Sequence, residues 1–179
     1  MVLRRGAMRM FRAIKTFIKD PDPVDDFGSV EPGLNIVEGI VKVKEPIRSP
    51  VKGHNCVAFF YRSFLVMSQS QGAAIHKLKE SEVYTSFDLE MTGGTLSVVP
   101  SSKGRFEQRD HQELQKRYGQ GFQGIEEVVL PGARVRVRGK VKKRGDSLVM
   151  VLKEISVMDK QAVSTGVGGD RKKRRKKNK

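Results

Sequence analysis

The sequence predicts a mainly β protein, and three observations lead to that class. Several segments alternate apolar and polar residues with period two, turn residues separate them, and only one internal stretch has helical spacing. A chain of 179 residues can bury the core of one domain without metal or disulfide. We therefore expect an OB-like barrel or a small β-sandwich, with one short inserted helix and an N-terminal amphipathic helix.

Residues 1–20 are predicted to form a basic amphipathic helix, with apolar side chains on one side and cations on the other. The apolar positions are Ala7, Met10, Phe11, Ile14, Phe17 and Ile18, and the basic ones are Arg5, Arg9, Arg12, Lys15 and Lys19. Three interpretations stay open. The apolar side packs on its own domain, it lies in a membrane interface, or the stretch is a targeting segment.

The first half of the remaining chain contains a linker and two strands. Residues 21–33, rich in proline and aspartate, are predicted to be the linker. The first strand, 34–44, is apolar on both sides around Gly39, which predicts a bend where a sheet curls into a barrel. An aromatic and β-branched run predicts the second strand at 56–67. The segment 68–80 is polar and rich in glycine, serine and glutamine at its start, which predicts a loop.

The second half contains a hairpin, a helix and two final strands. Residues 82–91 alternate in period two, and 95–99 return after a glycine turn. A charged, glutamine-rich stretch over 106–118 predicts the short inserted helix. The final strands are expected at 133–143 and 147–158, which completes a domain over residues 34–158.

The net charge of +15 sits mostly on two appendages. Residues 1–19 contribute +6 and residues 170–179 contribute +7, so the rest of the chain is almost neutral at +2. Residues 159–179 have too few apolar side chains to bury a core, and we expect a disordered polybasic tail. An anionic partner is therefore expected to meet the appendages first.

One strand also carries a concentrated positive charge. Period two places alternating cations of the segment 134–142 on one face and valines on the other. We expect this face and the tail to bind an anionic partner, although a solvated sheet face explains the strand equally well. The residues are Arg134, Arg136, Arg138, Lys140 and Lys142 of the strand, and Arg171, Lys172, Lys173, Arg174 and Arg175 of the tail.

Short motifs over residues 34–158 resemble the GIDE-type domain of membrane-embedded E3 ubiquitin ligase-like proteins. The matching pieces are Gly39, Ser49-Pro50 followed by Cys56-Val57, the segment 86–94, Val98-Val99-Pro100, and Leu130-Pro131-Gly132-Ala133 with Val135, Val137, Gly139 and Val141. The resemblance implies a β module beside a membrane, flanked in that family by transmembrane helices.

The ligase activity of that family is not expected here. It belongs to a separate RING, which needs a run of zinc-binding cysteines and histidines, and this chain has one cysteine and three histidines. No apolar run is long enough for a transmembrane helix either. The amphipathic helix is then a possible substitute anchor.

We expect no enzyme, no cofactor and no metal site. Residues 119–124 spell GxGxxG, but they follow a helical stretch, whereas the dinucleotide fingerprint follows a strand, so we interpret them as a flexible loop. His54 and Cys56, with His76 or His111, are the remaining candidate ligands or nucleophiles. A lone cysteine opening an apolar strand is usually a small core residue, so we expect no catalytic role for it.

The sequence therefore predicts a non-enzymatic, cytoplasmic module that is peripheral to an anionic membrane surface, and that holds an unknown protein partner there. The membrane-binding residues are expected to be Met10, Phe11, Ile14, Phe17 and Ile18, with Arg5, Arg9, Arg12 and Lys15. The alternative is a single-stranded nucleic-acid binder, an RNA-binding OB-like barrel with aromatics such as Phe59 and Tyr61. The sequence leaves the oligomeric state open.

Overall fold

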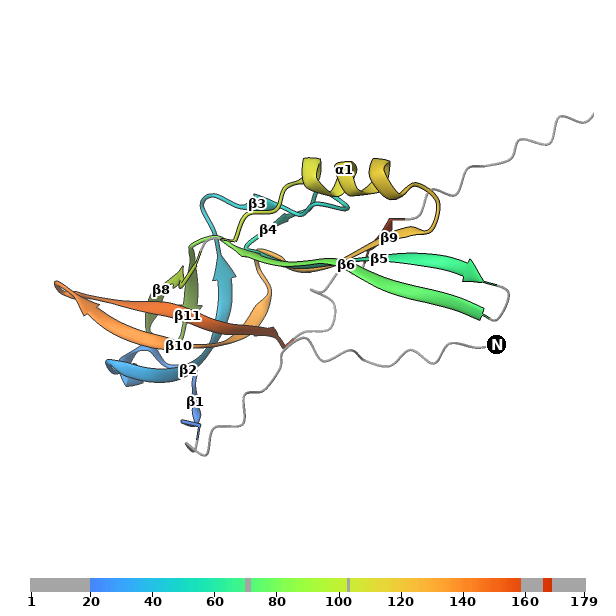
Figure 1. The fold of residues 1–179 in the computed structure, drawn as a ribbon. Helices are drawn as coiled ribbons and strands as arrows, with labels where there is room; N and C mark the ends of the chain where they lie inside the picture. Colours follow the sequence, from blue (N-terminus) through green and yellow to red (C-terminus); the bar gives the residue numbers. More distant parts are fainter. Residues whose placement is uncertain (1–19, 70–71, 103, 159–165, 169–179) are drawn as a thin grey trace, which may run out of the picture.

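A computed structural model describes residues 20–69, 72–102, 104–158 and 166–168 (Figure 1). The predicted amphipathic helix and the cations predicted in the tail lie outside the described residues. The elements, in chain order, are β1 (Pro23–Val24), η1 (Phe27–Ser29), β2 (Gly33–Lys42), β3 (Ile47–Arg48), β4 (Asn55–Cys56), β5 (Ala58–Gln69), β6 (Gly72–Tyr84), β7 (Phe87–Met91), β8 (Gly94–Pro100), α1 (Gln108–Tyr118), β9 (Phe122–Val129), β10 (Arg134–Arg144), β11 (Ser147–Val157) and β12 (Gly166–Gly168).

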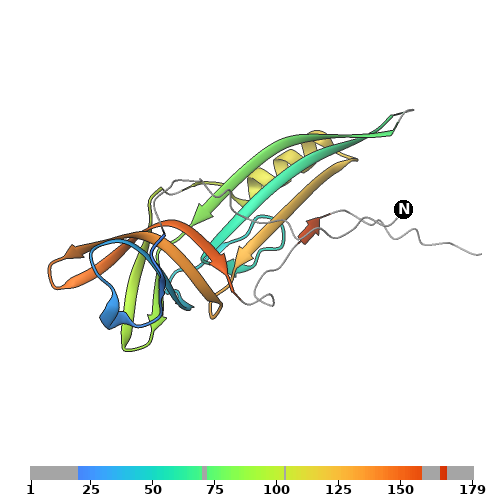
Figure 2. The ribbon, with the colours of Figure 1, turned by 90° about the horizontal axis from the view of Figure 1, so that it is seen from below.

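Five of these strands close into a β-barrel, which confirms the predicted mainly β class and its OB-like form. Around the barrel the order is β2, β10, β11, β8 and β7, and β7 pairs with β2 to complete the ring. The pairing of β11 with β8 is parallel, and the other four barrel pairings are antiparallel. Figures 1 and 2 show the barrel at one end of the molecule.

The barrel closes where β2 bends, as the glycine at position 39 predicts. Strand β2 pairs with β10 as far as Ile40 and with β7 from Ile40 onward. A Cβ on Gly39 would lie 2.5 Å from the carbonyl oxygen of Glu90 and 2.8 Å from Leu89 Cγ. Only a residue without a side chain allows the two strands to approach this closely.

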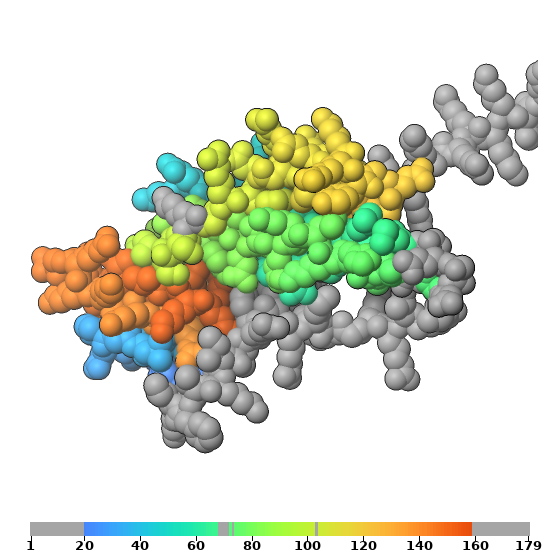
Figure 3. Space-filling view, in the orientation of Figure 1, coloured from blue at the N-terminus to red at the C-terminus, as the bar shows by residue number. Residues whose placement is uncertain are grey.

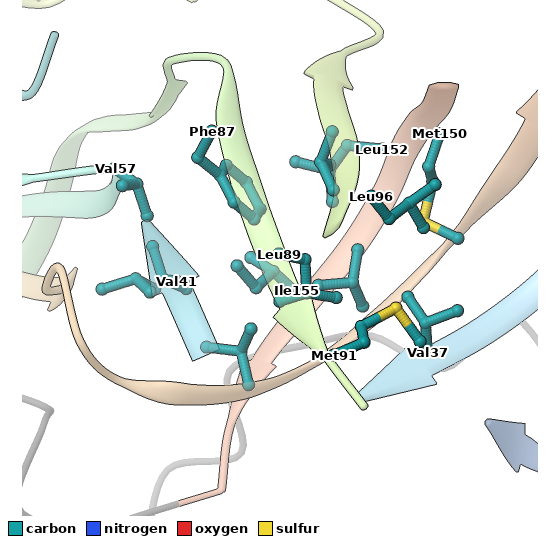
Figure 4. Packing of buried hydrophobic residues seen from close by; sticks show 14 of the residues in the cluster. Val37, Val41, Val57, Phe87, Leu89, Met91, Leu96, Met150, Leu152 and Ile155 are labelled. Atoms are coloured by element: carbon teal, nitrogen blue, oxygen red, sulfur yellow. The ribbon is translucent and has the colours of Figure 1, made fainter. Parts of the chain in front are cut away.

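The barrel interior is filled by aliphatic side chains and methionines, with one aromatic ring (Figure 4). Val37, Val41, Leu89 and Leu96 are fully buried, and each occupies an alternate position of its strand. This period-two burial is what makes these segments strands, because the apolar side of each must face the same core.

A second sheet projects from the barrel, and we call its strands β5, β6 and β9 the arm. Strand β5 is central, between β6 and β9, and helix α1 lies along one face of the sheet (Figures 1 and 3). Beneath the helix, the ring of Tyr61 stacks on Phe106 at 4.3 Å between centroids. The helix prediction is confirmed within two residues of its start.

Four segments differ from the sequence-based expectation. The predicted loop at 68–80 falls mostly within β6, and the glycine-rich 119–124 leads directly into β9, because both segments pair with β5. The predicted linker lies against the barrel, where β1 pairs with β2 and Val30 is buried. Within the predicted disordered tail, β12 pairs with β9. In each case, hydrogen bonds to a neighbouring strand satisfy the backbone N–H and C=O groups of a segment whose own sequence shows no strand pattern.

Candidate functional site

Strand β10 carries the predicted cations on its outer side. Its valines at positions 135, 137 and 141 are at most 1% exposed inside the barrel, and the cations alternate with them. Four of the five cations are exposed and Arg138 is half-buried; the set is Arg134, Arg136, Arg138, Lys140 and Lys142. The predicted separation of charge from core along this strand is confirmed, and the binding role of the cations stays a prediction.

Carboxylates from elsewhere in the chain hold three of these cations. Arg136 donates to Glu38 with its Nε at 2.8 Å, and Arg134 approaches the same carboxylate at 3.7 Å. Arg138 pairs with Asp20 at 2.6 Å. The sequence shows no anion between the cations of β10, but the sheet register places Glu38 directly opposite Arg136. This half of the strand therefore has its counter-ions within the chain.

The other half of β10 forms the hairpin end, which we define as Lys140, Lys142, Lys143 and Arg144. Three of these residues lie on or beside the turn to β11, and all four are exposed. Among the described residues, none of the four has a carboxylate within ion-pair distance. The turn itself adds the single negative charge of Asp146, so the four cations of the hairpin end keep a positive net charge. This is the strongest concentration of unneutralised charge that the described strands present.

The neighbouring outer face of β7 and β8 has the opposite character. In OB-folds the face of the second and third barrel strands holds the ligand. Here that face carries Asp88, which accepts a hydrogen bond from Ser97 at 2.8 Å, and Glu90, which pairs with Lys42 at 3.1 Å. Lys42 offsets the charge of Glu90, and the Asp88 carboxylate at this position opposes the phosphates of a nucleic acid.

The aromatic residues that the sequence offers for base stacking lie inside the protein. Phe59 is 3% exposed and Tyr61 is fully buried beneath α1. The Tyr61 hydroxyl lies 3.0 Å from Nδ1 of His111. Stacking on bases needs an accessible ring face, and neither residue provides one. Their role in this structure is to pack the arm against its helix.

A buried carboxylate that the sequence analysis does not single out lies in the arm. Glu126 of β9 is fully buried and accepts hydrogen bonds from the Ser49 hydroxyl at 3.0 Å and from the backbone N–H groups of Val51 and Lys52 at 2.7 and 2.9 Å. Charge-assisted bonds of this kind compensate the burial of an anion. Glu126 therefore fastens the connection between β3 and β4 to the arm.

The candidate ligands and nucleophiles do not form a reactive site in the described structure. Burial, with the Glu126 charge nearby, raises the pKa of Cys56 to about 12, so its thiol stays protonated at neutral pH. Burial lowers the pKa of His111, against the opposing effect of Glu126, and its ring is neutral. The described residues contain no group of three side chains suited to a metal ion.

A cleft of about 600 Å³ lies between the barrel and the base of the arm. Its lining mixes Lys44 with Glu45 and Asp88, and adds the hydroxyl-bearing Thr85 and Ser97. Charges of both signs are therefore present, and no single ligand charge is favoured by this lining.

The described residues contain no helix that is long and apolar enough to span a bilayer. Helix α1 has 11 residues, which is too short to cross a bilayer. The residues predicted to enter a membrane, 5–18, and the tail cations at 171–175 lie outside the described residues. Comparison with protein-family models, curated proteins and solved structures finds no significant match to this chain.

Proposed function

We propose that this protein is a non-enzymatic interaction module that binds peripherally to an anionic membrane surface. The observation that carries the proposal is the hairpin end, Lys140, Lys142, Lys143 and Arg144, whose cations are exposed and have no carboxylate partner among the described residues. The basic amphipathic segment at 7–18 supplies the apolar part of the contact. The resemblance to a GIDE-type domain, a module beside a membrane, agrees with this role.

Membrane electrostatics give the proposal a magnitude. Each lysine or arginine near an anionic surface contributes about 1 kcal/mol, and the contribution decays within a Debye length. Reversing two cations of the hairpin end therefore costs about 2 kcal/mol or more, which is about a 30-fold loss of affinity. Binding is expected to weaken as salt rises, because the hairpin end is solvent-exposed.

Nucleic acid is the competing anionic partner, and the OB-like barrel is the observation in its favour. Two features of the structure weigh against it. Phe59 and Tyr61 are buried, and the Asp88 carboxylate occupies the outer face of β7. The hairpin end fits either anion, and binding to vesicles or to single-stranded RNA distinguishes the two functions.

The test compares two charge-reversed variants of the full chain in sedimentation with phosphatidylserine-containing vesicles. Lys142→Glu/Lys143→Glu alters the hairpin end, and Lys116→Glu/Arg117→Glu is the matched control, since it reverses two adjacent exposed cations on α1. We expect the first variant to bind about 30-fold more weakly and the control to bind almost like the wild type. Equal losses in both variants, or tight binding of single-stranded RNA with no vesicle binding, would contradict the proposal.

A further inference from the structure

Strand β6 is the free edge of the arm. The order of strands in this sheet is β12, β9, β5 and β6, and among the described residues no strand pairs with the outer side of β6. The strand has 13 residues, which is longer than most strands of globular proteins. Its outer side therefore presents a row of backbone N–H and C=O groups to any further strand that approaches.

The half of this edge near the barrel is protected against such pairing. Gly104 lies so close to the carbonyl oxygen of Glu82 that a Cβ at position 104 would clash with it. Farther out, the register with β5 shifts at Leu78, which forms a bulge. Bulges and covering loops are usual devices that prevent an edge strand from pairing. The part without such protection is the outer half, Gly72–Lys77, which has no proline and no acidic residue, and which we call the open edge.

Large apolar side chains are exposed at the open edge. Tyr61 of β5 points toward α1, so period two places Met67 on the same side and Ile75, opposite Val66, on the other side. Ile75 is 67% exposed and Met67 is 38% exposed. Here β5 and β6 extend beyond β9, whose pairing with β5 stops at Leu65 (Figure 2). A two-stranded ribbon is marginally stable in water, and a further strand on its edge would stabilise it.

A second copy of the open edge is complementary to the first. In an antiparallel pair related by a two-fold axis, a residue faces either itself or a residue on the same side of the sheet. A pairing centred on Ile75 places the two isoleucines against each other, and Ala74 against His76 of the other copy. Lys77 then lies against position 73, which carries no charge. No two like charges are directly opposed in this register.

Charge favours a second copy over a strongly charged partner strand. The open edge carries a single lysine and no acid, so an acidic or basic strand would form few ion pairs along it. In the symmetric pair the two Lys77 residues lie four positions apart, which is about 13 Å at 3.3 Å per residue. This exceeds the Debye length of about 8 Å at physiological salt, so the two cations repel each other only weakly. A pairing centred on His76 would instead oppose two histidines and place Lys77 against Ile75.

We propose that two copies of this chain join edge to edge through Gly72–Lys77 of β6, antiparallel and with Ile75 against itself. The two arms then form one continuous sheet, in which the open edges exchange backbone hydrogen bonds. Each Ile75 side chain is covered by its counterpart, as an aliphatic cross-strand pair. The shared surface is small, which predicts a reversible dimer. This dimer does not depend on the proposed membrane binding.

Disulfide capture in the full chain tests which residues meet. Directly opposed residues of an antiparallel pair have Cα atoms about 4.5–5.5 Å apart, a separation that a disulfide spans. Ile75→Cys is compared with Ile40→Cys, a matched control at an exposed isoleucine of the barrel strand β2, and the native Cys56 is fully buried. Under mild oxidation we expect Ile75→Cys to run mostly as a dimer on a non-reducing gel, and Ile40→Cys to run as a monomer. Equal cross-linking of the two variants, or none in Ile75→Cys, would overturn the proposal.

Charge exchange at position 75 tests the two-fold symmetry by sedimentation equilibrium. Ile75→Lys and Ile75→Glu each oppose two like charges, so we expect each variant to stay monomeric at concentrations where the wild type and the control Ile40→Lys form dimers. An equal mixture of the two variants opposes a lysine to a glutamate, and we expect it to restore the dimer. A wild type that stays monomeric, a dimer that persists in Ile75→Lys, or a mixture that stays monomeric would each overturn the proposal.

Discussion

We expect removal of the Glu126 carboxylate to lower the free energy of unfolding of the protein substantially. Glu126→Ala leaves the N–H groups of Val51 and Lys52 and the Ser49 hydroxyl without their acceptor. A buried donor that loses its partner costs about 1–3 kcal/mol. Val51 and Lys52 are partly exposed, so water replaces part of the loss. We therefore expect a loss of about 2–3 kcal/mol, a large share of the usual 5–15 kcal/mol of a domain.

The assay is urea unfolding of the full chain, with Glu127→Ala as the control. Glu127 is the next residue of β9 and lies on the other side of the sheet, where burial raises the pKa of its carboxyl despite the opposing Arg62. Burial thus already disfavours the Glu127 carboxylate, and we expect its removal to cost under about 1 kcal/mol. The reasoning is refuted if Glu126→Ala is no less stable than Glu127→Ala.

Two further predictions concern the barrel and the arm. Gly39→Val places a Cβ 2.5 Å from the Glu90 carbonyl oxygen, and we expect a loss of about 2–3 kcal/mol in urea unfolding; wild-type stability would contradict the close approach of β2 and β7. The pKa of His111 in the folded protein is lowered from its ordinary value of 6.5, which applies in the unfolded chain. As the pH falls through 6.5, the unfolded chain therefore binds more protons at this histidine than the folded chain does. The free energy of unfolding should therefore fall between pH 7.5 and 5.5, and fall less in His111→Gln; the same slope in both proteins would contradict the assignment.

The parts of the fold that sequence reasoning predicts are those where a segment carries its own pattern. Strand β10 alternates cations and valines, so its position and its two sides follow from period two alone. Gly39 marks the bend of β2 because a strand interior rarely contains glycine without a close approach. Helix α1 likewise follows from a charged stretch with helical spacing.

The parts that it misses depend on partners far away in the chain. Strand β6 starts with small residues and carries Lys77, Lys79, Glu80 and Glu82 in its second half, and pairing with β5 makes it a strand. Glu38 neutralises Arg136 across 98 positions of sequence, and only the register of two strands shows it. Glu126 is the same residue type as its half-buried neighbour Glu127, and its burial follows from the loop that folds over it. Composition therefore overestimates the free charge of the β10 face, and the structure restricts it to the hairpin end.

The central claim is that the chain binds an anionic membrane through residues 7–18, and one sedimentation experiment tests it most directly. The full chain and its Phe11→Asp/Ile14→Asp/Phe17→Asp variant are spun with phosphatidylserine-containing and with phosphatidylcholine vesicles, and a variant with leucine at the same three positions keeps the apolar side as the control. We predict that the wild type and the leucine variant sediment with the anionic vesicles alone, while the aspartate variant stays in solution. An aspartate variant that sediments like the wild type would contradict the account.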